Sequence, residues 1–433
     1  MKFIEKAFGF NPSTMQLKTE LIAGATTFLT MSYVLAVNPA VLSATGMDRG
    51  ALFTSTAIVS AIATLLLAIM AKLPFAQAPS MGLNAFFAYT MCQAMGYTWQ
   101  QSLAIMLVEG VVFIIITFFN IREMILNSIP ETLRYAISAG IGMFIAFIGL
   151  KNAGIIVAKQ GTFVGLGQFT PTCLLGIFAI LTSGILMARN VKGSLFWSII
   201  LTTIVGIPFG VTSLPDNWIP VSMPQDLSPI FCKFTFDGII NLKTFLVIFS
   251  LLIVNIFDTI GTLMGLAEKT GIVRPDGSIP HVKEAMMSDA IGTTCGAFFG
   301  SSTITTYVES ASGIAEGGKS GVTSFTVSML FLIALFLSPV FLLIPSAATS
   351  GALVMVGVLM LDSIKEIDLK DLSESFPAFI TMITMVLTYS IADGICLGIL
   401  SYVFIKLFTG KYSQLNPTLC VLSVLFIINF MFG

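Results

Sequence analysis

Long apolar stretches recur along almost the whole chain and constrain its fold more than any other feature. Only 10% of the 433 residues are charged and 56% are hydrophobic, too apolar a balance for a water-soluble protein of this size. Helices satisfy their own backbone hydrogen bonds in lipid, so the sequence predicts an all-α protein that crosses a membrane many times. Twelve stretches cross or nearly cross a core of about 30 Å: 21–37, 52–71, 101–119, 130–150, 171–188, 194–210, 242–266, 285–299, 322–343, 346–361, 376–391 and 394–409.

Two further segments, 75–93 and 301–316, are too polar or too broken by proline and glycine to be ordinary lipid-facing helices. Counting both as crossings gives fourteen spans. With a cytoplasmic N-terminus, alternation then assigns 16 of the 21 Lys and Arg residues to the cytoplasm, as the positive-inside rule requires. Omitting either segment weakens this bias, so we expect both to cross. The short apolar run 418–432 either spans the membrane or lies at its interface.

The sequence also holds two copies of a seven-span unit. Span five opens with SIPETLRYAISAGIGM and span twelve with LIPSAATSGALVMVG, while Pro171 and Pro377 stand at the start of spans six and thirteen. The two broken segments take places three and ten. Because seven is odd, the second copy enters from the opposite side, which makes an inverted repeat. Paired interrupted segments at matching positions indicate the binding site of a transporter.

The remaining composition argues against several function classes. A net charge of −1 without a basic patch argues against nucleic acid as a partner. The six cysteines are scattered and His281 is the single histidine, so no metal site, disulfide framework or cofactor is predicted. The first 20 residues are polar and lack the core of a signal peptide. We therefore expect a multi-pass protein of the cell membrane.

Four carboxylates fall inside or close to predicted spans: Glu109, Asp258, Asp289 and Glu309. A carboxylate at mid-bilayer costs about 2.5–3.5 kcal/mol on insertion scales, so each is expected to face a cavity or a partner. We expect Asp289 at the mouth of its helix and Glu109 in a hydrogen bond between helices. Asp258 is a stronger site candidate, because it lies on a polar helix face with three neighbours in LIVNIFDTIGTLMG: Asn255, Thr259 and Thr262.

Glu309 lies in the tenth segment, SSTITTYVESASGIAEGGKSG. The alternation in STITT suits an extended stretch, and a half-helix can begin close to Glu309. The third segment, FAQAPSMGLNAFFAY, has Asn84 in the matching place. We expect the two extended pieces to meet at mid-membrane with unpaired backbone groups and two helix N-termini directed at one point. Lipid cannot satisfy such groups, so the pattern predicts a site for a polar solute.

The groups at this site match the mixed donors and acceptors of a planar heterocycle. Phe86, Phe87 and Tyr307 are placed to stack on such a ring, although packing is the simpler role for any one of 37 phenylalanines. A carboxylate in so apolar a place can take up and release a proton near neutral pH, which would couple the solute to a proton gradient.

Four stretches resemble a known family: TTFLTMSYVLAVNP, APSMGLNAFFAY, VNIFDTIGTLMG and TITTYVESASGIAEGG. They look like the purine permease branch (hypoxanthine, adenine and guanine permeases) of the nucleobase–cation symporter-2 family, in the same order over nearly the whole chain. The resemblance implies fourteen spans in two inverted repeats, divided into a core domain (1–120 and 242–344) and a gate domain (121–241 and 345–433). It also implies a homodimer formed through the gate.

The resemblance implies roles for single residues as well. Asp258 and Glu309 would bind the base, and one or both would take part in proton coupling, with Na⁺ in place of H⁺ left open. Asn84 falls on the asparagine of span three. The implied activity is import of adenine, guanine or hypoxanthine, without a choice among them. The backbone of three further positions would line the cavity: Gly82, Thr305 and Thr306.

Two other functions compete with this one. A carrier of sulfate or bicarbonate would share the fold, but two acidic residues would repel an anion unless both were protonated. FDTIGT and Asp393 superficially resemble an intramembrane aspartyl protease, whose two aspartates must share a proton and a water at close range. Asp393 falls at the outer end of its predicted span. We therefore expect a transporter and not an enzyme.

Overall fold

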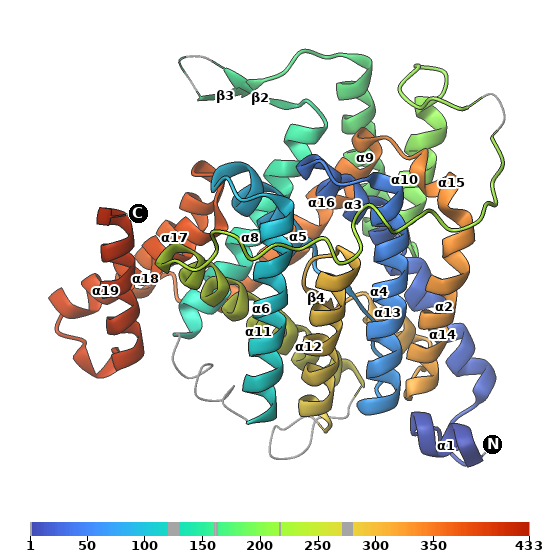
Figure 1. The fold of residues 1–433 in the computed structure, drawn as a ribbon, viewed down its shortest axis with the longest axis horizontal. Helices are drawn as coiled ribbons and strands as arrows, with labels where there is room; N and C mark the ends of the chain where they lie inside the picture. The colour runs from blue at the N-terminus through green and yellow to red at the C-terminus, as the bar shows by residue number, and fades with distance from the viewer. Residues whose placement is uncertain are drawn as a thin grey trace.

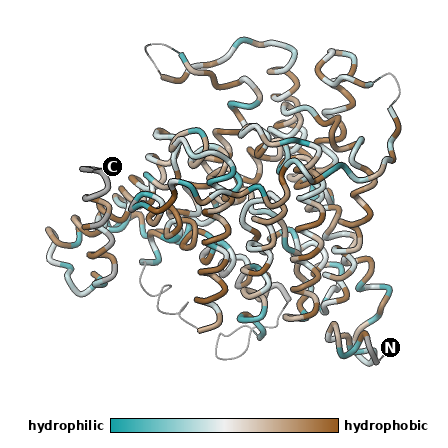
Figure 2. Tube along the Cα trace, viewed as in Figure 1, coloured by the Kyte–Doolittle hydropathy of each residue, from teal (hydrophilic) through white to brown (hydrophobic). Residues whose placement is uncertain are grey.

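The computed structural model describes residues 2–119, 130–159, 161, 163–215, 218–270 and 280–432, which are mostly helical. Each of the twelve predicted apolar stretches falls on helix, and Figure 2 shows apolar residues following these helices. Among the described residues, eight helical stretches are long and apolar enough to cross a membrane: Leu17–Thr45, Arg49–Met70, Trp99–Phe118, Glu131–Asn152, Pro171–Ala188, Gly321–Leu342, Ser346–Glu366 and Ile391–Phe408. The count of fourteen crossings stays a prediction.

The helices form two groups that pack mainly within themselves (Figure 1). The core helices are α2 (Leu17–Met31), α3 (Val34–Leu42), α4 (Arg49–Met70), α5 (Met81–Ala85), α6 (Trp99–Phe118), α11 (Leu242–Thr270), α12 (Val282–Phe299), α13 (Ser310–Ala315), α14 (Gly321–Ala334) and α15 (Ser338–Leu342). The gate helices are α8 (Glu131–Asn152), α9 (Pro171–Ala188), α10 (Ser194–Gly206), α16 (Ser346–Met360), α17 (Leu372–Leu387) and α18 (Ile391–Phe408). The groups meet where α8 contacts α5 and α11, and where α16 contacts α3.

The two ends of the chain and a hairpin lie outside these groups. A short helix, α1 (Lys2–Phe8), packs on α14 and α4, and the last helix, α19 (Pro417–Phe432), packs on α18 and α11. Strands β2 (Ile156–Lys159) and β3 (Phe163–Leu166) form a hairpin on the face opposite the N-terminus (Figure 1).

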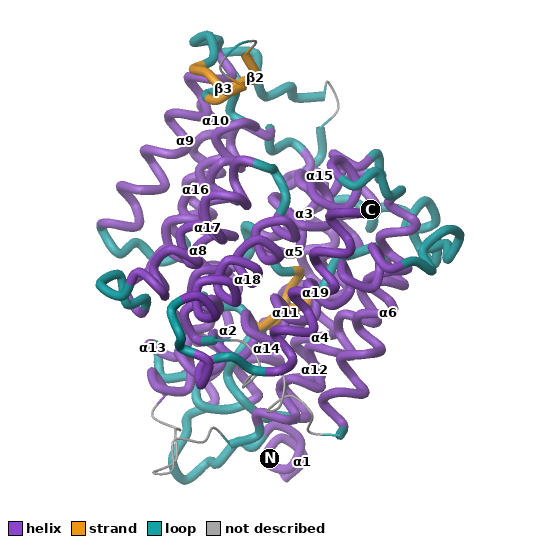
Figure 3. Tube along the Cα trace, turned by 90° about the vertical axis from the view of Figure 1, so that its left-hand side faces the viewer, coloured by secondary structure: helices purple, strands orange, loops and turns teal. Residues whose placement is uncertain are grey.

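The two broken segments meet as a short antiparallel ribbon at the centre of the core helices, visible as the central strands in Figure 3. Strand β1 (Gln77–Pro79) pairs with β4 (Ile304–Thr306), with Ala78 opposite Thr305. One further backbone bond closes each end, from Tyr307 N–H to Ala76 C=O (2.9 Å) and from Ser80 N–H to Thr303 C=O (3.0 Å). The prediction of extended pieces that meet is confirmed. The prediction that their backbone groups stay unpaired is wrong, because each strand satisfies the other.

Two threonines hold the outer edges of this ribbon in matching ways. Thr64 of α4 accepts from the N–H of Gln77 (3.0 Å) and donates to its C=O (2.9 Å). Thr293 of α12 does the same for Ile304, at 3.0 and 3.4 Å. These helices are spans two and nine of the predicted repeat, so the bonds are related as an inverted repeat requires.

The other sequence features that predicted the repeat agree only in part with the helix boundaries. Helix α8 begins directly after Pro130 and α16 directly after Pro345, which agrees with the matched Ile-Pro openings. Pro171 is the first residue of α9, whereas Pro377 lies inside α17. The predicted match of Asn84 with Glu309 is also displaced. Because Ala78 pairs with Thr305, residue 309 corresponds to Gly82 (309 − 305 = 82 − 78), and Asn84 lies one half-turn further on.

A test of the ribbon is Thr64→Val, which removes the donor and acceptor for both backbone groups of Gln77 at constant shape. Leaving buried backbone groups without partners costs about 1–3 kcal/mol each, so we expect the melting temperature of the protein in detergent to fall by several degrees. Thr326→Val is the matched control, because the Thr326 hydroxyl donates to Val322 C=O in its own helix. Equal melting temperatures for the two variants would contradict the role given to Thr64.

Candidate functional site

Asp258 connects the two halves of the ribbon. It lies on α11, and its Oδ2 accepts a hydrogen bond from Ser80 Oγ at 3.1 Å, just beyond the end of β1. It also accepts from the hydroxyl of Thr305, at the centre of β4. Its side chain is only partly buried. A single carboxylate therefore binds hydroxyls from both broken segments and keeps part of its surface open.

Glu309 lies directly before α13, near the start of the half-helix as predicted. Its Oε1 accepts from Tyr33 Oη at 2.7 Å, and its backbone carbonyl accepts from Thr30 Oγ1 at 3.4 Å. The side chain is partly buried, and Asp258 is close enough to repel it electrostatically. Tyr307 interacts electrostatically with both carboxylates. The structure thus brings together the two acids that the sequence singled out.

Tyr33 is a site residue that the sequence reasoning missed. It lies in the break between α2 and α3, is 2% exposed, and directs its hydroxyl at Glu309. The only signal was the interruption itself: Ser32 and Tyr33 in the first apolar stretch mark a place where a helix is not continuous. Which distant side chain they meet depends on tertiary packing.

The other two carboxylates bond to hydroxyls in and next to β4 but are fully buried. Thr303 Oγ1 donates to Glu109 Oε2 at 3.2 Å, and Glu109 Oε1 accepts from Asn255 Nδ2 at 2.8 Å, which confirms the predicted bond between helices. Thr306 Oγ1 donates to Asp289 Oδ1 at 3.3 Å. The prediction that Asp289 sits at the mouth of its helix is wrong, because α12 already begins at Val282 and carries it into the core.

The other predicted site residues differ in what they contact. Asn84 is buried and accepts a hydrogen bond from Ser302. Gly82 faces the gate, where an added Cβ would lie 2.8 Å from Cγ2 of Ile141 on α8. Tyr307 donates its hydroxyl to Pro79 C=O at 2.5 Å, which fixes its ring across the ribbon. Two rings proposed for stacking are fully buried in the hydrophobic core, on the π-helical segment η2 (Phe86–Ala94): Phe86 and Phe87.

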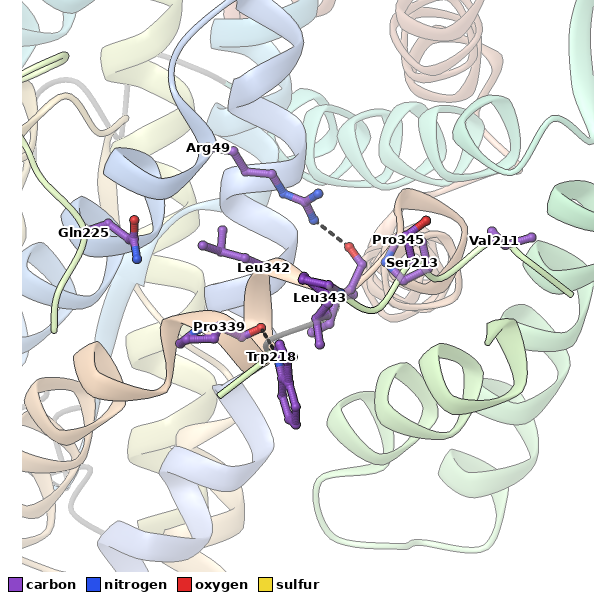
Figure 4. Close-up of a pocket in the computed structure, with 11 residues that line it drawn as sticks. Arg49, Val211, Ser213, Trp218, Gln225, Pro339, Leu342, Leu343 and Pro345 are labelled. Atoms are coloured by element: carbon purple, nitrogen blue, oxygen red, sulfur yellow. Dashed lines mark hydrogen bonds between the residues drawn. The ribbon is translucent and has the colours of Figure 1, made fainter. Parts of the chain in front are cut away.

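Two cavities open on the face opposite the N-terminus, and neither is lined by Asp258 or Glu309. One, of about 480 Å³, lies beside Arg49, whose guanidinium donates to Ile344 C=O at 2.6 Å (Figure 4). Trp218 lines the same cavity and donates to Pro339 C=O. The other, of about 520 Å³, lies between the β2–β3 hairpin and Tyr389.

Core and gate are joined beneath the second cavity by what we call the Tyr389 contact, formed by Tyr89, Lys151 and Tyr389. The Lys151 ammonium lies 4.7 Å from the Tyr389 ring centre and 5.6 Å from that of Tyr89, and it donates to Tyr389 Oη at 3.0 Å. The two rings meet edge to face at 5.6 Å. Tyr389 has φ +58°, a left-handed conformation that costs about 1–2 kcal/mol and needs such packing to persist.

Residues 18–427 match the sequence pattern of a family described as the Permease family. The chain is 40% identical to adenine permease AdeP of Escherichia coli (strain K12), over 99% of this chain and 96% of that protein. It is 38% identical to guanine/hypoxanthine permease PbuO of Bacillus subtilis (strain 168), over 97% of this chain and 99% of that protein. The chain belongs to the nucleobase–cation symporter-2 family of permeases.

The fold of the permease also occurs in solved transporter structures. The transmembrane domain of the cyanobacterial bicarbonate transporter BicA matches 88% of this chain and 97% of that domain, with a TM-score of 0.64 and 14% identity. At this identity the likeness shows the fold alone, with its core and gate helices. The permease is a transporter in a multi-pass membrane fold and not an enzyme, so the protease alternative is set aside.

Tyr33→Phe tests the contact with Glu309. The variant keeps the ring and removes the hydroxyl donor, and a hydrogen bond to a charged group contributes about 1.5–3 kcal/mol. We expect the permease to fold normally while the KM for its substrate rises about tenfold or more. Tyr97→Phe, which removes a hydroxyl bonded to Thr244, is the matched control. An unchanged KM in Tyr33→Phe would exclude Tyr33 from the site.

Proposed function

We propose that the permease imports purine nucleobases, and that Asp258 and Glu309 bind the base. The observation that carries the proposal is the exposure of these two acids: of the four carboxylates beside the ribbon, they alone are not fully buried. Two relatives, each aligned over nearly the whole chain, are named as adenine and guanine/hypoxanthine permeases. An accessible acid pair suits the ring N–H and amino groups of a purine, which are hydrogen-bond donors.

The hydroxyls around these acids make the binding reversible. Ser80 and Thr305 donate to Asp258, and Tyr33 donates to Glu309, so each acid has its partners before a base arrives. A neutral hydroxyl can turn toward another acceptor at small cost, because its hydrogen rotates freely. At Asp258 a purine donor can therefore replace a hydroxyl, which returns when the base leaves, whereas Tyr33 stays bonded to Glu309 and holds it in position. An anion would meet two carboxylates, which disfavours the bicarbonate-type alternative.

Transport would proceed by movement of the core domain (1–120 and 242–344) against the gate domain (121–241 and 345–433). Two features support this division: the helices pack mainly within these groups, and the ribbon lies within the core close to the gate helix α8. Proton symport fits the presence of four acids around the ribbon, none of which has a basic partner among the described residues. A cytoplasmic N-terminus, a place in the cell membrane and a homodimer complete the proposal.

Uptake of radiolabelled bases tests the proposed function directly. Cells that lack their own permeases and express this one are given adenine, guanine, hypoxanthine, xanthine or uracil, with and without a protonophore. We expect accumulation of at least one of adenine, guanine and hypoxanthine, exclusion of uracil, and loss of accumulation with the protonophore. Uptake of none of the five would contradict nucleobase transport, and accumulation that resists the protonophore would contradict proton coupling.

Glu309→Ala tests the site in the same assay. Removing an acid that binds the base should lower uptake about 100-fold or more, the equivalent of about 3 kcal/mol, while the amount of protein in the membrane stays normal. Glu131→Ala is the control, since Glu131 has a side chain that is 76% exposed at the start of α8. Near-normal uptake by Glu309→Ala would remove Glu309 from the site.

Movement of core against gate predicts that the Tyr389 contact opens during transport. Lys151→Met removes the cation from two rings and should weaken the contact by about 1–2 kcal/mol. A cysteine introduced at Thr90, whose hydroxyl accepts from Ile391 N–H across the same boundary, reports the opening. We expect about tenfold faster labelling by a membrane-impermeant maleimide in Lys151→Met, with the six native cysteines replaced by serine. Lys159→Met, in the exposed hairpin, is the control, and equal labelling rates would exclude this gate.

A further inference from the structure

Glu109 is a buried acid for which the proposed base-binding site has no use. It lies in the middle of α6 and is 0% exposed. Both oxygens accept from neutral donors, Oε1 from Asn255 Nδ2 at 2.8 Å and Oε2 from Thr303 Oγ1 at 3.2 Å. Among the described residues, no lysine, arginine or histidine forms an ion pair with it. An ionised carboxylate without a cation or backbone N–H partner is expensive at this depth.

The surroundings of Glu109 contain more acceptors than donors. Asn255 Oδ1 is also buried and has no hydrogen-bond partner in the described structure. Two carboxylate oxygens and one amide oxygen thus share one amide NH₂ and one hydroxyl. A proton on Glu109 supplies the missing donor. A half-turn of the Asn255 amide would then place Oδ1 where Nδ2 now lies, to accept from the carboxyl O–H. The same two residues can therefore hold the acid in either charge state.

Glu20 is a second buried glutamate, and its carboxylate has a different set of donors. It is equally buried, at 1% exposed, and it belongs to α2, but its carboxylate lies at the N-terminus of α14. Its carboxylate accepts from the backbone N–H groups of Lys319 (3.0 Å) and Ser320 (3.3 Å), and from Thr323 Oγ1 at 2.6 Å. Backbone donors at a helix N-terminus stabilise the charged form. Among the described residues, Glu109 accepts only from an amide and a hydroxyl side chain, so its surroundings lack the backbone N–H donors that favour a charged carboxylate.

The other titratable groups on the helices packed against α6 are directed elsewhere. Gly110 packs against Thr294 of α12, which adds only a hydroxyl beside Glu109. Lys283 lies near the start of α12 and donates to Phe118 C=O at the end of α6, while Glu284 faces His281. The deeper groups and their partners are Asp258 with Ser80, Asp289 with Thr259 and Thr306, Cys92 of η2 with Ser102, and Tyr89 of η2 with Asn152, while Cys295 of α12 is partly exposed. The charge on Glu109 therefore depends mainly on Asn255 and Thr303.

A short series of hydrogen bonds connects Glu109 with the base site. The Thr303 hydroxyl donates to Glu109, and the Thr303 carbonyl accepts from Ser80 N–H. Ser80 in turn donates its hydroxyl to Asp258. We propose that Glu109 is a second proton-binding site of the permease, separate from Asp258 and Glu309, and that its protonation acts on the base site through Thr303 and Ser80. This inference rests on the proposed function.

The test uses purified permease in liposomes and two measurements with radiolabelled adenine, guanine or hypoxanthine, whichever the wild type accumulates. The first is accumulation driven by an inward proton gradient, and the second is exchange of labelled for unlabelled base at equal pH. Glu109→Gln resembles the protonated state. We expect its gradient-driven accumulation to fall at least tenfold while exchange stays within about twofold of wild type. Wild-type accumulation by Glu109→Gln would overturn the inference and leave the proposed function intact.

Two further variants keep the test decisive if Glu109→Gln does not fold. Thr303→Val removes one donor from the ionised acid at constant shape, so the pH at which accumulation declines should move upward; an unchanged profile would overturn the inference. Glu20→Gln is the matched control and should leave the ratio of accumulation to exchange unchanged. Wild-type accumulation driven by a Na⁺ gradient at equal pH would also overturn a proton site. Absence of both accumulation and exchange in the wild type would instead contradict purine transport.

Discussion

The pairing of β1 with β4 is the interaction on which the rest of the core depends. A strand inside a helical membrane protein cannot leave its backbone groups to lipid, so each N–H and C=O must find a partner within the protein. The two strands supply these partners to each other, and Thr64 and Thr293 supply them at the outer edges. Because the strands come from opposite halves of the sequence, neither can take this conformation alone. The site therefore exists only when both repeats are assembled.

The extended conformation also decides what the hydroxyls can do. In the helices of this protein, Thr294 and Thr326 donate to the carbonyl four residues earlier, which occupies their hydrogen. A strand has no such carbonyl within reach. The hydroxyls of Thr303, Thr305 and Thr306 are therefore free to point outward, and each bonds a different carboxylate. A single helical threonine can also bond an acid, as Thr259 does with Asp289, but one turn of helix would not direct three hydroxyls to acids on three surrounding helices.

Much of this arrangement could be predicted from the sequence, and the failures share one cause. The apolar runs predict the helices. Pro79 and the alternating hydroxyls before Glu309 predict the two extended pieces. Both predictions succeed because these signals lie within short stretches of sequence. The contact of Tyr33 with Glu309 and the burial of Asp289 depend on how distant helices pack, which no local pattern records. The expected unpaired backbone was wrong for the same reason: each segment was considered with lipid as its surroundings and not with the other segment as its partner.

The two strands carry different kinds of side chain, although their backbones are related by the repeat. Around the ribbon, the first copy places Ala76, Ala78 and Pro79 where the second places Thr303, Thr305 and Thr306. Further on, Gly82 of the first copy corresponds to Glu309, and it gives the gate helix α8 room to approach. Small residues in one copy thus leave space, and the polar groups of the other copy fill it. The backbone of the ribbon is symmetric but its side chains are not, so one face of it is strongly polar. If the two copies were identical, each would place the same polar side chains near the centre, and the two sets would occupy the same space.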